Sequence, residues 1–424
     1  MGWIVVLLLL VGSASLTFYL AKRTDSVKQT FVALLIQITL SIGFLFFWGL
    51  QDDAATYHQA AILLADSWSN NLDPVYTLPE GKRSTVVIAG FSYWFVGPFP
   101  AVALLFMATI TAWLPSLLAT STRLFGFQGS AKLAAWLGAI APPMLLWAPR
   151  LTRESQAFVL LGLATVVFGM LFRRKFNLSA LALWLALAWA MSVTRPQLLL
   201  VLAFGTMSAV LLSKKDPHSP PAKNLQLVAS IALGLTLSSL AIWWTFSSSD
   251  TGRLVQPGVR AAIAQELSSP AQNLGIDYTS SSSETKQDSN PITENMEPNS
   301  PEAKQDSNPI TENVERGINS LIGPFPWQWE SISWIAAGLD GLMMLVLWCL
   351  IVFGAIKFPS TRRISLILIA ATLPLIAGEA YFHANYGITM RVRAHYLILL
   401  LPLIAVQIGG GKKLLAKKEK MGVC

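Results

Sequence analysis

Two adjacent aspartates, Asp52 and Asp53, directly follow a long apolar run, and Asp53 begins the stretch Asp-Ala-Ala-Thr-Tyr-His-Gln-Ala-Ala. A carboxylate held where a membrane helix meets water can act as a general base that takes a proton from an acceptor hydroxyl. An aspartate in this position can instead cap the helix that follows it. The two roles are compatible, because a capping residue has a fixed position. Both aspartates are therefore candidate catalytic residues.

The residues after the aspartates predict a short amphipathic helix that lies along the outer surface of the membrane. Its apolar face would consist of Ala54, Tyr57, Ala61, Leu64 and Trp68, a spacing typical of a helix that buries one side. Such a helix would hold the carboxylates at the membrane surface and aim them at the cavity between the membrane helices.

The composition is that of an integral membrane protein. Of the 424 residues, 53% are hydrophobic and only 13% are charged, whereas soluble domains carry roughly 25% charged residues. The net charge of +8 is explained by basic cytoplasmic loops that orient membrane helices. The expected partners are therefore membrane lipids and not nucleic acid. The two cysteines, Cys349 and Cys424, predict no disulfide framework.

The apolar runs predict an all-α polytopic membrane protein with about 11 transmembrane helices. The expected spans are 2–21, 30–50, 99–121, 132–148, 155–172, 178–193, 197–213, 226–246, 333–356, 364–380 and 394–410. Most basic residues of the short loops then share one side with the lysine-rich tail, which predicts an external N-terminus and a cytoplasmic C-terminus. The apolar stretch 86–97 contains two glycines and is too short to cross, so we expect a re-entrant or interfacial segment there.

This topology divides the chain into three parts. Residues 1–246 would hold the N-terminal membrane helices together with an external first loop at 51–98. Residues 247–330 would form a late external loop, and 331–424 the last membrane helices and a basic cytoplasmic tail. The late loop repeats Lys-Gln-Asp-Ser-Asn-Pro-Ile-Thr-Glu-Asn, beginning at 286 and at 304. Its polar composition predicts disorder, and the repeat carries no evident chemistry.

A span followed by Asp-x-x-x-Tyr-His-x-x-Ala and then a span rich in Phe and Pro resembles the GT-C superfamily of membrane glycosyltransferases. In particular it resembles bacterial members akin to the family 39 protein mannosyltransferases. Three further segments resemble external pieces of such enzymes: 147–154 and 385–393 as turns, and 320–329 as an aromatic and proline segment. The first span and the late insertion depart from the pattern of the superfamily.

The resemblance implies an enzyme of the bacterial inner (plasma) membrane that builds cell-envelope polysaccharides or glycoconjugates. It would move a sugar from a polyprenyl-phosphate-linked donor to a lipid, glycan or protein acceptor on the outer face. Asp53 matches the acidic residue of the first external loop that serves as base or metal contact, and Asp52 is its neighbour. A divalent metal, Mg or Mn, is compatible with that role, although the number of ligands in the sequence does not require one.

Four arginines fall on the outer face, against the orientation bias, namely Arg150, Arg153, Arg391 and Arg393. Arginine suits bidentate contacts with phosphate, and a leaving lipid phosphate needs counter-charge. These residues are therefore candidate donor-phosphate ligands. The alternative is that they contact lipid headgroups or pair with external glutamates such as Glu154.

Five residues are candidates for lining the cavity: Tyr57, His58, Lys82, Arg83 and Asp340. Asp340 lies inside an apolar run, where an ionisable group signals either a cavity or a partner on another helix. His58 could bind a metal or shuttle a proton, but a lone histidine on a surface helix more commonly packs or forms hydrogen bonds. The histidines of the chain show no metal-ligand spacing.

Two other functions fit parts of the pattern. An O-antigen-type polymerase or ligase also combines many spans with external arginines, but here the acids lie in the first loop. A lipid-linked-sugar flippase or transporter is a second alternative, although the chain shows no duplicated half. The sequence lacks a Walker loop, a dinucleotide fingerprint and a nucleophile elbow, which argues against an ATPase, an oxidoreductase or an α/β-hydrolase. The oligomeric state stays open.

Overall fold

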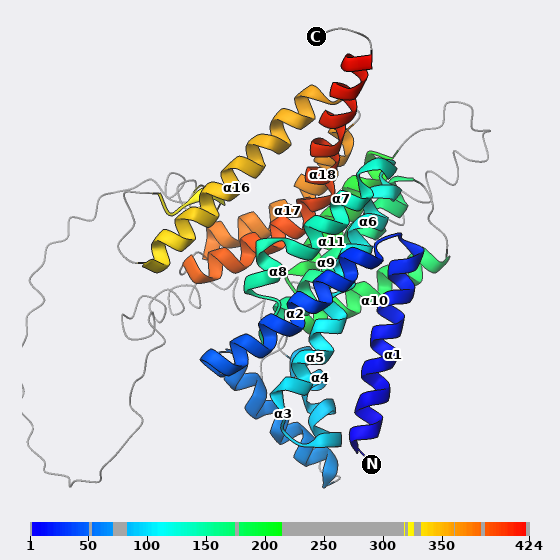
Figure 1. Cartoon of the computed structure of the whole chain (residues 1–424). Helices are drawn as coiled ribbons and strands as arrows, with labels where there is room; N and C mark the ends of the chain where they lie inside the picture. Colours follow the sequence, from blue (N-terminus) through cyan, green and yellow to red (C-terminus); the bar gives the residue numbers. More distant parts are fainter. Residues whose placement is uncertain are drawn as a thin grey trace, which may run out of the picture.

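The computed structural model describes most of the chain outside the predicted late loop. The described residues are 2–50, 53–70, 83–173, 178–213, 318, 321–325, 332–359, 361–382 and 386–420. Asp52, Lys82, the expected span 226–246 and nearly all of the predicted disordered loop lie outside these ranges. Within them the chain is helical and contains no β-strand (Figure 1). The prediction of an all-α fold is confirmed for this part of the chain.

The helices follow the apolar runs of the sequence. They are α1 (Gly2–Arg23), α2 (Val27–Trp48), α3 (Asp53–Ser69), α4 (Arg83–Val96), α5 (Pro100–Thr111), α6 (Leu114–Leu124), the 3₁₀ turn η1 (Gln128–Ser130), α7 (Ala131–Ile140), α8 (Pro142–Leu146), α9 (Glu154–Phe172), α10 (Leu178–Thr194), α11 (Leu198–Leu211), α16 (Ile332–Lys357), α17 (Arg362–Phe382) and α18 (Tyr386–Lys420).

Among the described residues, 6 helical stretches are long and apolar enough to cross a membrane. They are Gly2–Arg23, Val27–Trp48, Pro100–Leu124, Glu154–Phe172, Gly338–Lys357 and Thr389–Gly409. The helices α10 and α11 are apolar but shorter. These helices are compatible with an integral membrane protein. The total of about 11 spans stays a prediction.

Proline breaks one of the expected spans and shapes another. The run 132–148 is divided into α7 and α8 at Ala141, whose ψ of 139° is extended because Pro142 follows it. In the run 99–121, α5 ends at Thr111 and α6 begins at Leu114, with a proline in its first turn. Most of the stretch 86–97 lies in the short helix α4, which ends at Val96. The next residue, Gly97, has a φ of 87°.

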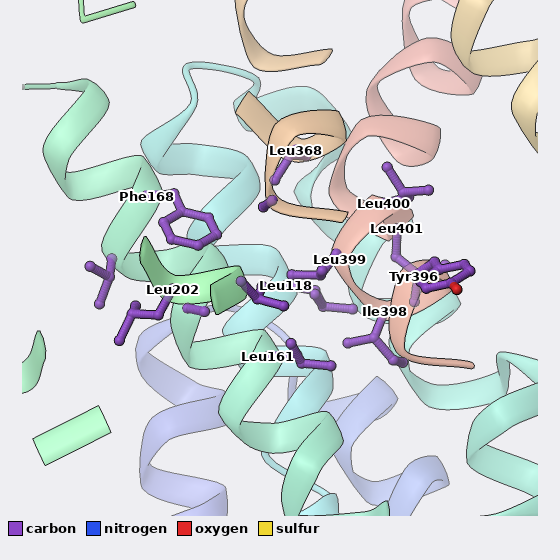
Figure 2. Packing of buried hydrophobic residues seen from close by; sticks show 14 of the residues in the cluster. Leu118, Leu161, Phe168, Leu202, Leu368, Tyr396, Ile398, Leu399, Leu400 and Leu401 are labelled. Carbon is purple, nitrogen blue, oxygen red and sulfur yellow. The ribbon is translucent and has the colours of Figure 1, made fainter. Parts of the chain in front are cut away.

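The centre of the molecule is a packed helical core, and the outer helices are exposed. In α9 and α18, 83% of the apolar window is buried, compared with 17% in α1. Side chains from α6, α9, α11, α17 and α18 interdigitate in this core, including Leu118, Phe168, Leu202, Leu368 and Leu399 (Figure 2). Gly205 leaves the space that the Phe168 ring occupies, since a Cβ there would collide with the ring. The helices α1, α2 and α16 expose apolar side chains that suit contact with lipid.

The predicted surface helix is present as α3, and it packs against α4 at one end of the molecule (Figure 1). Ala54, Tyr57, Ala61 and Leu64 are buried on the predicted face, and Trp68 is half-buried. The pattern of apolar residues therefore predicted this helix and its packing side correctly.

Candidate functional site

Three alternating residues of α18 each meet a carboxylate from a different helix. The pairs are Arg391 with Asp53 of α3 at 3.0 Å, Arg393 with Asp340 of α16 at 3.3 Å, and His395 with Glu154 of α9 at 3.3 Å. Residues four apart share a helical face, so Arg391 and His395 point one way and Arg393 points elsewhere. α18 thereby connects acids that are far apart in the sequence.

The segment that carries these residues is helical, which corrects the sequence-based expectation. Residues 385–393 were expected to form an external turn, but α18 begins at Tyr386 and contains both arginines. No helix-breaking glycine pair or proline precedes Pro402 in this segment to stop the helix. The arginines are therefore held by a regular backbone. By contrast, the predicted turn at 147–154 is present between α8 and α9.

Asp53 is the most accessible acid of this network. It is the first residue of α3, and its side chain is 37% exposed while that of Arg391 is 24% exposed. A carboxylate in the first turn is stabilised by the helix dipole. Its Oδ2 accepts a hydrogen bond from Arg391 Nη1. The structure thus brings together Asp53, the candidate base, and Arg391, a candidate phosphate ligand, which the sequence analysis considered separately.

The guanidinium groups of Arg391 and Arg150 both lie over the indole ring of Trp147. The Cζ atom of Arg391 lies 4.9 Å from the centroid of the Trp147 ring, and that of Arg150 lies 5.2 Å from it. Arg150 also lies 5.2 Å from the ring of Phe44. The face of an aromatic ring attracts a cation, and this contact restricts where the guanidinium group can lie. Arg150 and Arg391, two of the candidate donor-phosphate ligands, thus contact the same aromatic ring.

A cavity of about 320 Å³ adjoins Arg150. It lies between the end of α2, the start of α3 and the turn before α9, and its lining is mostly apolar, including Phe44, Trp48, Leu50 and Leu104. Arg150 contributes the only guanidinium among the lining residues. An apolar cavity with a cation at its edge suits a molecule that joins a hydrocarbon chain to an acidic headgroup.

A largely buried ionic cluster lies next to the accessible pair of Asp53 and Arg391. Glu154 is 2% exposed, and its Oε1 accepts a hydrogen bond from Arg195 Nη2 at 2.7 Å. The second oxygen of Glu154 faces His395, whose ring lies 5.5 Å from that of Phe158. Burial lowers the pKa of Arg195 to about 10, so its guanidinium stays charged at neutral pH. In the sequence, Arg195 is visible as a cation between two apolar runs, but nothing there indicates that Glu154 and His395 would both contact it.

Arg393 and Asp340 form a packing contact between α16 and α18. The Arg393 side chain is only 1% exposed, and its Nη2 also donates to the carbonyl of Gly323. A cavity of about 10 Å³ beside the pair has room for no more than a water molecule. Of the two roles that the sequence left open for Asp340, the structure shows a partner on another helix. Arg393 is buried away from the large cavity, whose lining does not include it.

The other predicted site residues that the structure describes lie in α3, at the start of α4 and directly before α9. Arg83 is the half-buried first residue of α4, and Arg153 is half-buried directly before α9. Tyr57 is only 1% exposed, and burial raises the pKa of its hydroxyl, which therefore keeps its proton. Within the described part of the chain, no group of three or more His, Cys, Asp or Glu side chains is arranged to hold a metal ion.

His58 connects α3 to α4. Its Nδ1 lies 2.8 Å from the hydroxyl of Tyr93, and the two rings meet edge to face. Burial lowers the pKa of His58, so the imidazole is neutral at pH 7. The hydrogen bond indicates that His58 holds α3 against α4. Of the roles considered for His58, this is packing and hydrogen bonding.

The lowered pKa of His58 predicts a pH-dependent stability. The folded value lies below the ordinary 6.5, so below about pH 6.5 the unfolded chain binds the proton more readily. Stability should therefore fall as the pH drops through that range. Thermal unfolding in detergent at pH 7.5 and 5.5 should show a larger decrease for the wild type than for His58→Gln. An equal decrease in both proteins would show that His58 titrates normally.

No protein-family model matches the sequence, no curated protein matches it, and no solved structure matches the fold.

Proposed function

We propose that the chain is a membrane glycosyltransferase that moves a sugar from a polyprenyl-phosphate-linked donor to an acceptor hydroxyl. One observation carries this proposal. Asp53 and Arg391 pair at 3.0 Å beside an apolar cavity of about 320 Å³ that also contains Arg150. The site thus combines a half-exposed carboxylate, two stacked cations and a space for a hydrocarbon chain.

In this proposal the arginines bind the phosphate of the donor. The isoprenoid carbons next to the phosphate occupy the cavity between α2 and α3, and Arg150 and Arg391 direct their N–H groups at the phosphate oxygens. When the bond between the sugar carbon and the phosphate oxygen breaks, negative charge grows on the leaving phosphate. Fixed guanidinium groups stabilise that charge without having to reorganise.

Asp53 takes the proton of the acceptor. The acceptor oxygen forms the new bond to the sugar carbon, its proton passes to the carboxylate of Asp53, and polyprenyl phosphate leaves. A phosphate on Arg391 competes with Asp53 for the same guanidinium, whose Nη1 now contacts Asp53 Oδ2. Binding of the donor would therefore free the carboxylate at the moment when a base is needed.

The experiment supplies the purified protein in lipid nanodiscs with radiolabelled sugars on polyprenyl phosphate or on nucleotides, together with extracted envelope lipids and glycans. The proposal expects transfer from the lipid-linked donors only, with release of polyprenyl phosphate. Transfer from nucleotide sugars alone would overturn it. Movement of intact lipid-linked sugars across proteoliposomes would indicate a flippase, and joining of preassembled chains a polymerase or ligase.

A further inference from the structure

A second group of polar side chains lies one helical turn away from the accessible ion pair. On α3, Tyr57 comes one turn after Asp53, and on α18, His395 comes one turn after Arg391. Tyr57 is 1% exposed and His395 is completely buried. The hydroxyl of Tyr57 and the Nδ1 of His395 have no hydrogen-bond partner among the described residues.

The tautomer of His395 does not change this conclusion. Its Nε2 lies 3.3 Å from Glu154 Oε2 and 3.5 Å from Arg195 Nη1. Nε2 therefore either donates a hydrogen bond to the Glu154 carboxylate or accepts one from the Arg195 guanidinium. In both cases Nδ1 has no hydrogen-bond partner among the described residues. The Nε of Arg195 and the hydroxyl of Thr152 are also buried without a partner in the described part of the chain.

These unpaired atoms come from four separate places: α3, the turn before α9, the turn between α10 and α11, and α18. Glu154 contacts both Arg195 and His395, and Thr152 precedes Glu154 by two residues. Tyr57 and His395 each follow one member of the pair of Asp53 and Arg391 by a helical turn, so the group is one region of the protein. Buried polar atoms are nearly always paired in folded proteins. Four elements that each bring such an atom to one region indicate a site for a ligand.

The donors and acceptors of the group select the kind of ligand. Arg195 Nε can only donate a hydrogen bond, and the Tyr57 hydroxyl can donate or accept one. His395 Nδ1 donates or accepts according to the tautomer of the ring. The carboxylate of Glu154, already neutralised by Arg195 at 2.7 Å, repels a further anion, and Arg195 repels a cation. A hydroxyl group both donates and accepts, so it satisfies every member of this set.

We propose that the cluster of Tyr57, Thr152, Glu154, Arg195 and His395 binds a neutral, hydroxyl-bearing ring such as a sugar. This inference rests on the proposed function, because it places a sugar ring within a helical turn of the phosphate site. The ring belongs to the donor or to the acceptor. Its hydroxyls would supply the partners that the buried atoms otherwise lack.

The test measures thermal stabilisation of the purified full-length protein in nanodiscs by methyl mannoside, methyl glucoside and methyl galactoside. The variant Tyr57→Phe removes only a hydroxyl without a partner, so the free protein should be as stable as the wild type or more stable. At least one glycoside should stabilise the wild type saturably, and the variant should bind it roughly tenfold more weakly. The matched control Asp66→Asn, at an exposed aspartate of the same helix, should bind it as the wild type does.

Two results would overturn the inference: no saturable stabilisation of the wild type by any glycoside, or equal stabilisation of the wild type and Tyr57→Phe. Inorganic phosphate whose binding weakens in Tyr57→Phe would instead assign the cluster to an anion. These outcomes are independent of turnover. Glycoside binding without any transfer would reject the proposed function and keep this site.

Farnesyl phosphate with and without an attached sugar distinguishes the source of the ring. If the cluster holds the sugar of the donor, the glycosylated lipid binds more tightly than the bare lipid phosphate, and Tyr57→Phe abolishes that difference. If the cluster holds the acceptor, the free glycoside stabilises the protein further in the presence of saturating glycosylated lipid. Absence of both effects would contradict a sugar site in this place.

Discussion

Asp53→Asn is expected to lower the rate of sugar transfer at least about 100-fold, the effect of losing a general base. The amide has the shape of the carboxylate and still accepts a hydrogen bond from Arg391, the contact that Asp53 makes at 3.0 Å. It cannot take up the proton of an acceptor hydroxyl. The loss should therefore appear in kcat, with little change in the amount of folded protein. Radiolabel transfer in membranes containing equal amounts of each protein measures it.

Asp66→Asn is the matched control, because Asp66 is an exposed aspartate on the same helix. This variant should transfer sugar at the wild-type rate. If Asp53→Asn also kept the wild-type rate, Asp53 would serve only to stabilise the first turn of α3. If both variants lost activity equally, the effect would arise from the charge of the surface helix and not from a base.

Among the variants considered, Glu154→Ala should lower the free energy of unfolding most, by about 3–5 kcal/mol. Glu154 is 2% exposed and contacts Arg195 at 2.7 Å and His395 at 3.3 Å. Its removal leaves the Arg195 guanidinium charged and buried without a counter-ion. Only 13% of the Arg195 side chain is exposed, so water can compensate little of this charge. Thermal or denaturant unfolding of the purified protein in detergent measures the loss.

The exposed pair of Asp25 and Lys132 provides the control. Their side chains are 72% and 67% exposed, so Asp25→Asn should leave stability unchanged within error. The double variant Glu154→Gln/Arg195→Gln should be more stable than Glu154→Gln alone, because no buried charge is then unpaired. Additive losses in the double variant, or a harmless Glu154→Ala, would show that the pair is not a buried ionic contact.

Local patterns were sufficient to predict α3 and the identity of its buried face. Apolar spacing depends on neighbours within one or two turns, and Ala54, Tyr57, Ala61 and Leu64 are all buried as expected. The stretch 86–97 was expected to be a re-entrant or interfacial segment because it is short and contains glycines; it lies in the helix α4, and its place in the membrane stays a prediction. Asp53 and Arg391 were both predicted to lie on the outer face, which stays a prediction, and nothing in their spacing showed that they would touch.

Tertiary contacts account for what the sequence did not show. Glu154, Arg195 and His395 are distant in the chain, and only the packing of α9 and α18 with the turn after α10 brings them together. Trp147 belongs to a turn whose sequence gives no sign that its ring would hold two guanidiniums. Arg393 and Arg391 look equivalent in the sequence, but residues two positions apart face different sides of a helix. Arg393 therefore contacts Asp340 of α16.

The most direct test of the site is a cryo-electron microscopy structure of the protein in nanodiscs with a short-chain polyprenyl phosphate. The phosphate should lie between Arg150 and Arg391 at the Trp147 ring, with the first isoprenoid units in the cavity that Phe44 and Trp48 line. The contact between Asp53 and Arg391 should lengthen in that complex. A phosphate bound elsewhere, with this ion pair intact and the cavity free of lipid, would contradict the proposed site.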